Sequence, residues 1–164
     1  MERVWLESPV YFVTTCTQHR RPILATTAVA NILSDEWRTA HKRHGWLVGR
    51  YVIMPDHVHF FCAAEPNAKT LSVLIGAWKE WTSKRIAREL GAAVAAGADR
   101  GPRSPRAATA EETARVWQRE FFDRVLRSEE SYAQKWEYVR QNPVRAGLTA
   151  RMEDWPFQGE IHSL

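Results

Sequence analysis

Cysteine is scarce in this chain, which contains only Cys16 and Cys62 among 164 residues. Two cysteines so far apart cannot form a zinc knuckle, whose ligands come in closely spaced pairs. Each lies in an apolar, strand-like segment, where a buried free thiol is the ordinary state. We therefore expect free thiols and a reducing compartment.

Long hydrophobic runs are also missing. No segment approaches the roughly 18 apolar residues that a membrane-spanning helix requires. The first ten residues, MERVWLESPV, lack the basic and then apolar pattern of a signal peptide. We expect a soluble cytoplasmic protein with no membrane partner.

Large apolar and basic residues are abundant. Hydrophobic residues make up 45% of the chain and include 8 Trp, enough for one packed core. The length suits a single domain spanning residues 1–164. The net charge of +4 and a pI near 9.3 favour a polyanionic partner such as nucleic acid.

Residue patterns predict alternating strands and helices. β-Branched and aromatic runs predict strands at 10–17, 46–54, 57–63 and 115–126, the last of which could also be simply an extended segment. Helical periodicity predicts helices at 27–44 and 71–90, and a third that Ser128 caps and Asn142-Pro143 ends. The Ala-, Gly-, Pro- and Arg-rich stretch at 91–113 predicts a flexible loop that is disordered or binds substrate.

The most informative segment is VIMPDHVHFF at 52–61, in which His57 and His59 flank one apolar residue. Side chains alternate along a strand, so both imidazoles share a face about 6.6 Å apart and could bind one metal ion. Core or surface histidines are the more common alternative, since no carboxylate stands at a diagnostic spacing. Asp56 could orient an imidazole, although a turn-forming Asp after Pro55 is the simpler interpretation.

The third helix presents an unusual tyrosine. Its apolar face comprises Tyr132, Ala133, Trp136 and Val139, whereas Tyr138 lies on the polar face. Asn142 follows four residues later, so a phenol and an amide carbonyl project from one helix end. Most tyrosines pack in the core or are simply exposed, and have no catalytic role. A metal-oriented phosphodiester could nevertheless be attacked by this hydroxyl, provided that a base or water removes a proton whose ordinary pKa is ~10.

Six segments resemble a known family: YFVTTCTQHRRPIL (11–24), YVIMPDHVHFF (51–61), LIGAWKEWTSKRI (74–86), VWQREFFDRVLRSEE (116–130), YVRQNPVRAGL (138–148) and DWPF (154–157). They resemble the HUH single-strand DNA transposases of the IS200 type, within them the REP-associated tyrosine transposases. The combination of His-Val-His with a tyrosine four residues before Asn-Pro is the most specific element.

The resemblance implies an α+β fold, with a ferredoxin-like antiparallel sheet, helices packed on it and a C-terminal helix carrying the nucleophile. It implies metal ligands at His57 and His59, a nucleophile at Tyr138, and a third ligand at Asn142. Insertion-sequence relatives often carry Gln at that last position. The family uses Mg²⁺ or Mn²⁺, cleaves single-stranded DNA near palindromic hairpins, and acts as monomers or homodimers.

Basic residues near these segments are candidates for DNA contacts. They are Arg20, Arg21, Lys79, Lys84, Arg85, Arg119, Arg124, Arg140 and Arg145. Two alternatives stay open: a hairpin-DNA-binding protein that no longer cuts, and a metal-dependent hydrolase of small phosphoesters in which Tyr138 is incidental. A third histidine or a carboxylate cluster would favour the hydrolase.

Overall fold

The computed structural model describes residues 9–96 and 115–164. Its elements are β1 (Val10–Cys16), η1 (Gln18–Arg20), α1 (Thr27–His44), β2 (Trp46–Ile53), β3 (His57–Ala64), α2 (Leu71–Ala96), β4 (Phe122–Leu126), α4 (Glu129–Arg140), α5 (Asn142–Arg145), η2 (Met152–Asp154) and β5 (Gln158–Glu160). The five strands pair antiparallel in the order β4-β1-β3-β2-β5. The β1-α1-β2-β3-α2-β4 sequence with strand order β4-β1-β3-β2 is the ferredoxin-like arrangement, as predicted.

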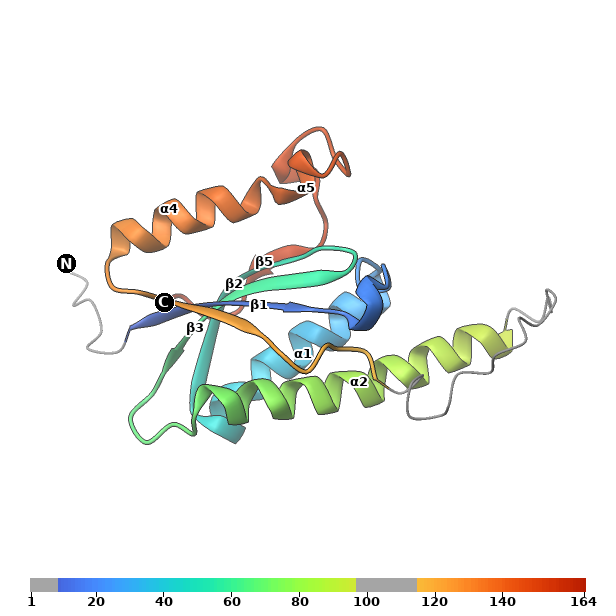
Figure 1. The fold of residues 1–164 in the computed structure, drawn as a ribbon, viewed down its shortest axis with the longest axis horizontal. Coiled ribbons are helices and arrows are strands. Elements are labelled where there is room, and N and C mark those ends of the chain that lie inside the picture. Colours follow the sequence, from blue (N-terminus) through green and yellow to red (C-terminus); the bar gives the residue numbers. More distant parts are fainter. Residues whose placement is uncertain (1–8, 97–114) are drawn as a thin grey trace.

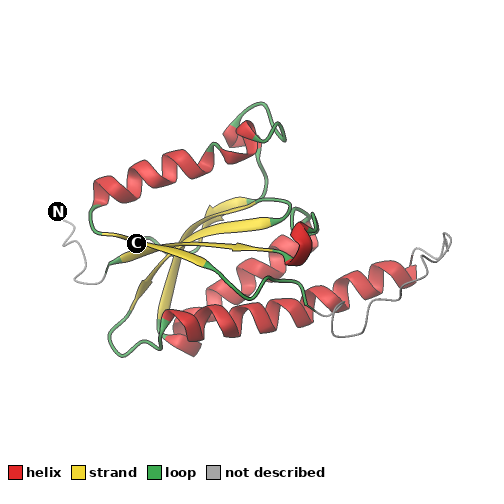
Figure 2. Ribbon diagram, in the orientation of Figure 1, coloured by secondary structure: helices red, strands yellow, loops and turns green. Residues whose placement is uncertain are grey.

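Helices cover both faces of the sheet. Figure 1 shows α1 and α2 on one face and α4 on the other, and Figure 2 shows the same layers coloured by secondary structure. Successive residues of β1 divide accordingly: Val13 joins the core with Trp37 of α1 and Trp78 of α2. Phe12 joins a second core that includes Val139 of α4. Strand alternation therefore gives the sheet a two-helix face and an α4 face.

The first helix has the ends that the sequence predicted. Thr26 precedes it, and the Thr26 side chain accepts a hydrogen bond from the Val29 amide. Gly45 follows it with φ +76°, and its amide donates to the His41 carbonyl. A Cβ added at Gly45 would meet the Ala68 backbone at 3.0 Å, so this left-handed cap suits glycine.

The hairpin between β2 and β3 sets the position of the histidines. The Met54 amide donates to the His57 carbonyl at 2.8 Å, which closes the turn over Pro55-Asp56. Asp56 also contributes its carbonyl to the Thr17 amide at 2.9 Å, next to the end of β1. The predicted tight connection is confirmed, and it lies beside the first strand.

Two sequence predictions were wrong at their boundaries. The predicted loop at 91–113 begins too early, because α2 continues to Ala96 through a Gly-Ala-Ala-Val-Ala-Ala run in which alanine favours helix. Residues 97–113 lie outside the described residues. The predicted strand at 115–126 is shorter in the structure and spans only Phe122–Leu126. Lys79 donates hydrogen bonds to the successive carbonyls of residues 118–120, so all three point toward one ammonium group. In an extended strand, successive carbonyls point in alternating directions, so these residues cannot be part of a regular strand.

The C-terminal part begins as predicted. Ser128 caps α4, accepting from the Ser131 amide, and Tyr132 and Val139 are buried. Ala133 was wrongly assigned to the apolar face, because it lies exposed beside the buried Tyr132. The sequence did not predict β5, a three-residue strand that pairs with β2. Within residues 9–96 and 115–164, no helix is long and apolar enough to cross a membrane.

Candidate active site

His57 and His59 lie on the α4 face of β3. The ring centroids are 4.8 Å apart and the ring planes cross at 80°. In the sheet register His57 lies opposite Cys16 and His59 opposite Thr14. The two imidazoles therefore meet on one face, as the strand alternation predicted.

Each ring is oriented by a hydrogen bond at Nδ1. His57 Nδ1 donates to Asp56 Oδ1 at 2.7 Å, and Thr14 Oγ1 lies 2.8 Å from His59 Nδ1. When Nδ1 carries the proton, Nε2 presents a lone pair. Within the described residues neither Nε2 has a hydrogen-bond partner. A carboxylate behind an imidazole is a common support for a metal-binding histidine, and Asp56 holds the His57 ring in addition to forming the turn.

Burial and nearby charges shift the pKa values of His59 and Asp56. Burial, followed by the charges of His57, Lys135, Arg145 and Arg20, lowers the pKa of His59 to about 3. Asp56 is partly buried, which alone would raise its pKa, but the hydrogen bond from His57 and the nearby Arg20 outweigh burial and lower it. At neutral pH the site therefore combines a neutral imidazole at His59 with an ionised carboxylate behind His57.

Tyr138 projects from α4 with 60% of its surface exposed. Two cations contact its ring: the Arg145 guanidinium at 4.1 Å and the Lys135 ammonium at 5.5 Å from the ring centroid. Arg145 also donates to the Tyr138 carbonyl at 2.7 Å. The phenol is thus accessible, and two positive charges lie beside its ring.

A chain of ring contacts joins the tyrosine to the histidines. The Lys135 ammonium lies 4.6 Å from the centroid of Phe12 as well as beside Tyr138. The Phe12 ring stacks on His59, with centroids 5.3 Å apart and planes at 18°. Residues about 80 positions apart therefore belong to one connected surface between α4 and the sheet. Sequence reasoning missed Lys135 and Phe12 as site residues, although Lys135 stands one helical turn before Tyr138.

Asn142 is the first residue of α5 and its side-chain oxygen accepts a hydrogen bond from the Arg145 guanidinium. The Arg145 contact uses one of the two lone pairs of this oxygen and leaves the other for a metal ion or a water molecule. Among residues 9–96 and 115–164 there is no group of three or more His, Cys, Asp or Glu side chains that could hold a metal ion. The two imidazoles fit a metal as a pair, and the Asn142 oxygen has the donor chemistry of a third ligand.

Several of the nine basic candidates have partners within the protein. Arg20 pairs with Asp56, Lys84 with Glu80, Arg85 with Asp35 and Glu36, and Arg140 with Glu137. Arg21 donates to the Arg115 carbonyl. Lys79 donates to three carbonyls. Arg124 and Arg145 lie on the Tyr138 side, and Arg119 lies beside α2.

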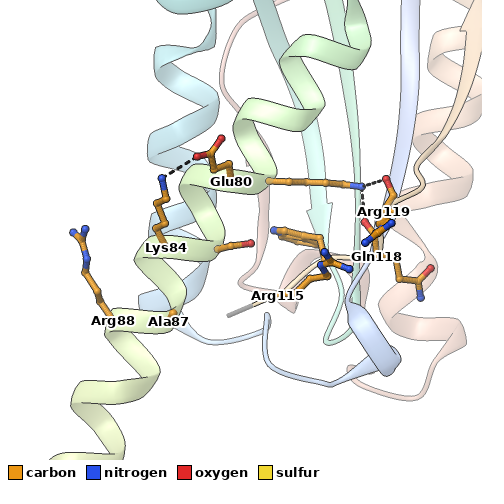
Figure 3. Close-up of a pocket in the computed structure, with 10 residues that line it drawn as sticks. Glu80, Lys84, Ala87, Arg88, Arg115, Gln118 and Arg119 are labelled. Atoms are coloured by element: carbon orange, nitrogen blue, oxygen red, sulfur yellow. Dashed lines mark hydrogen bonds and ion pairs between the residues drawn. The ribbon is translucent and has the colours of Figure 1, made fainter. Parts of the chain in front are cut away.

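A cavity of about 810 Å³ lies between α2 and residues 115–119. Figure 3 shows Lys84 and Arg88 on α2, with Arg115 and Arg119 on the facing segment. Because α2 packs on the opposite face of the sheet from α4, this basic cavity lies across the sheet from the histidine pair and Tyr138.

Comparison with known proteins connects this geometry to a family. A family model described as transposase IS200 like matches residues 7–97, which is more than half of the chain. The matched region contains the histidine pair and ends before Tyr138.

Two curated proteins match almost the whole chain. One, from Haemophilus influenzae, is named as a proposed REP-associated tyrosine transposase; it is 23% identical over 159 residues, covering 94% of this chain and 81% of the relative. The other is the REP-associated tyrosine transposase of Escherichia coli, 21% identical over 155 residues, covering 94% of this chain and 78% of the relative.

Solved structures share the fold. A REP-associated tyrosine transposase bound to a REP hairpin superposes with a TM-score of 0.65 at 19% identity, covering 96% of this chain and 80% of that one. A proposed transposase from Deinococcus radiodurans superposes with a TM-score of 0.55, also at 19% identity, covering 86% and 95%. At this identity the likeness concerns the fold.

Proposed function

This chain belongs to the IS200-like transposase family, and on that premise we propose that it is a metal-dependent single-stranded DNA endonuclease and strand transferase. It cleaves DNA near palindromic hairpins through Tyr138. The observation that carries this proposal is the contact chain from Tyr138 through Lys135 and Phe12 to His59, which connects an exposed phenol with two oriented imidazoles. The hairpin bound in a solved relative supports the choice of substrate.

Tyr138 is the nucleophile in this mechanism. Its hydroxyl oxygen attacks the phosphorus of the scissile phosphodiester while its proton passes to water or a nearby base. The bond from phosphorus to the 3′ oxygen breaks, that oxygen takes up a proton, and a 5′-phosphotyrosine forms. Attack by another 3′-hydroxyl reverses the step and joins a new strand, so no nucleoside triphosphate is consumed.

His57 and His59 would hold Mg²⁺ or Mn²⁺ through their Nε2 atoms, with Asp56 and Thr14 fixing the rings. Bound there, the ion would polarise and orient the phosphate. Lys135 and Arg145 supply positive charge beside the Tyr138 ring without involving the ion. Asn142 would add a third ligand through its side-chain oxygen, which also accepts from Arg145.

The test is formation of a covalent adduct. Labelled single-stranded DNA carrying a hairpin and its flanks is incubated with Mg²⁺ or Mn²⁺, and denaturing gels detect label bound to protein. Wild type should form the adduct, whereas Tyr138→Phe and His57→Ala should not. Tyr132→Phe, which removes a hydroxyl from the buried face of the same helix, is the matched control and should retain the adduct.

The alternatives give different results. A protein that binds hairpins without cutting would shift the DNA in a native gel but form no adduct. A hydrolase of small phosphoesters would release phosphate from a generic diester with Tyr138→Phe as active as wild type. An adduct formed equally by Tyr138→Phe would show that another residue is the nucleophile.

A further inference from the structure

Phe122 opens β4, the edge strand next to β1 in the sheet. It is 68% exposed, more than any other large hydrophobic residue in the described part of the chain. The ring faces solvent, so packing in the protein core does not explain the aromatic residue. Its position in the sheet suggests what does.

The sheet register puts Phe122 in the same row as His59, across the three neighbouring strands β4, β1 and β3. Phe122 lies opposite Thr14 on β1, and Thr14 lies opposite His59 on β3. Directly opposed residues of antiparallel strands project from the same face. With strands about 4.8 Å apart, Phe122 stands about 10 Å from His59 across the sheet, on the scale of one nucleotide.

Basic groups lie beside Tyr138, and one of them, Arg124, is on the same strand as Phe122. Arg124, two residues along the same strand, shares the face of Phe122 and lies opposite Phe12. A cavity of about 300 Å³ between β4 and α4 is lined by Arg124, Lys135 and Tyr138, with Ser131 and Gln134 adding polar groups. The two cations of this lining suit an anion, and Val125 and Leu126 complete the wall.

We propose that Phe122, Arg124 and Lys135 form a nucleotide subsite beside the reacting phosphate. The base of a nucleotide flanking the cut stacks on the Phe122 ring, and its phosphate binds Arg124 and Lys135. Every base has a flat face, so the ring contributes affinity without choosing a sequence. This inference rests on the proposed function for the identity of the substrate, and it adds the residue that orients the strand.

The test measures binding separately from cleavage. The Tyr138→Phe protein, which should not cleave, is titrated with hairpin DNA whose single-stranded flank carries one abasic nucleotide at successive positions around the cut mapped with wild type. Adding Phe122→Ala to this protein should weaken binding of intact DNA about tenfold, the effect of losing one base stack. Phe122→Trp should restore it. Trp81→Ala, which removes an exposed aromatic residue from α2, is the matched control.

At one abasic position the difference in affinity between the protein that retains Phe122 and the Phe122→Ala variant should vanish, because the stacking partner is missing. Equal loss at every position, or equal loss with Trp81→Ala, would overturn the subsite. So would a change from dimer to monomer on Phe122→Ala in sedimentation with unaltered DNA affinity, which would make the ring a contact between copies. If wild type forms no adduct, flank positions are scanned without the map, and a Phe122 effect confined to one position would support the subsite while the proposed cleavage fails.

Discussion

Replacing Lys79 with methionine tests whether this lysine stabilises the fold or contacts DNA. The Lys79 ammonium donates to the carbonyls of Gln118, Arg119 and Glu120 at 2.7, 3.2 and 2.8 Å. Methionine keeps an unbranched apolar stem but removes all three donors. Strand β4 (Phe122–Leu126) begins two residues after Glu120, so its position depends on this bend.

The expected loss is about 2 kcal/mol in the free energy of unfolding, since a hydrogen bond from a charged donor contributes roughly 1.5–3 kcal/mol. Only the Gln118 contact is partly buried, and the two exposed carbonyls can bind water after the substitution. The expected decrease in the free energy of unfolding is therefore that of losing one such hydrogen bond. For a domain of this size, about 2 kcal/mol corresponds to a fall in Tm of roughly 4–8 °C.

The assay is urea unfolding at pH 7, with DNA binding measured on the same samples. Burial lowers the pKa of Lys79 to about 8, so at pH 7 the wild-type ammonium is still charged. Lys84→Met, on the same helix, removes an exposed pair with Glu80 and a contact with the exposed Trp81 ring, and should cost about 1 kcal/mol or less. Affinity of Lys79→Met for single-stranded DNA should stay within about twofold of wild type.

An unchanged unfolding midpoint together with weaker DNA binding would refute this reasoning. In that case the salt dependence of binding should also fall by about one unit of slope, as for a lost phosphate contact. Lys79 would then be a DNA ligand, as the sequence suggested.

Two further substitutions test other contacts. Thr82 is fully buried and accepts the Trp117 indole N–H at 2.9 Å; Thr82→Val should destabilise the protein by roughly 1–3 kcal/mol in urea unfolding, because the buried N–H loses its acceptor, whereas Thr82→Ser should cost less. Asp56→Asn removes the charge behind His57, 2.7 Å away, and should raise the Mn²⁺ concentration for half-maximal adduct formation roughly 10- to 100-fold with little change in stability; an unchanged metal titration would show that Asp56 serves only the turn.

Local patterns predicted much of the fold. Helical periodicity over 27–44 located α1, and the Ser128 cap located the start of α4. Alternation also put His57 and His59 on one face. These features depend on residues close together in sequence, where capping and periodicity act directly.

Other features depended on distant residues that meet in the fold. Lys79 bends residues 118–120 from a position on α2, so no pattern within 115–126 could have predicted the shorter strand. The β5 strand exists because it pairs with β2, and three residues carry too little signal alone. The fold also gives Arg20, Arg21 and Arg85 acidic or carbonyl partners distant in the sequence, and their DNA contacts stay predictions.

The sequence by itself determined the strand that carries both imidazoles, the helix that carries Tyr138, and the motifs that resemble the family. Only the tertiary structure decided how they connect: Phe12 stacks on His59, Lys135 spans Phe12 and Tyr138, and Arg145 takes the Asn142 oxygen. It also put Phe122 in register with His59. The physical reason is that periodicity fixes which way a side chain faces, whereas strand order and helix packing fix which faces meet.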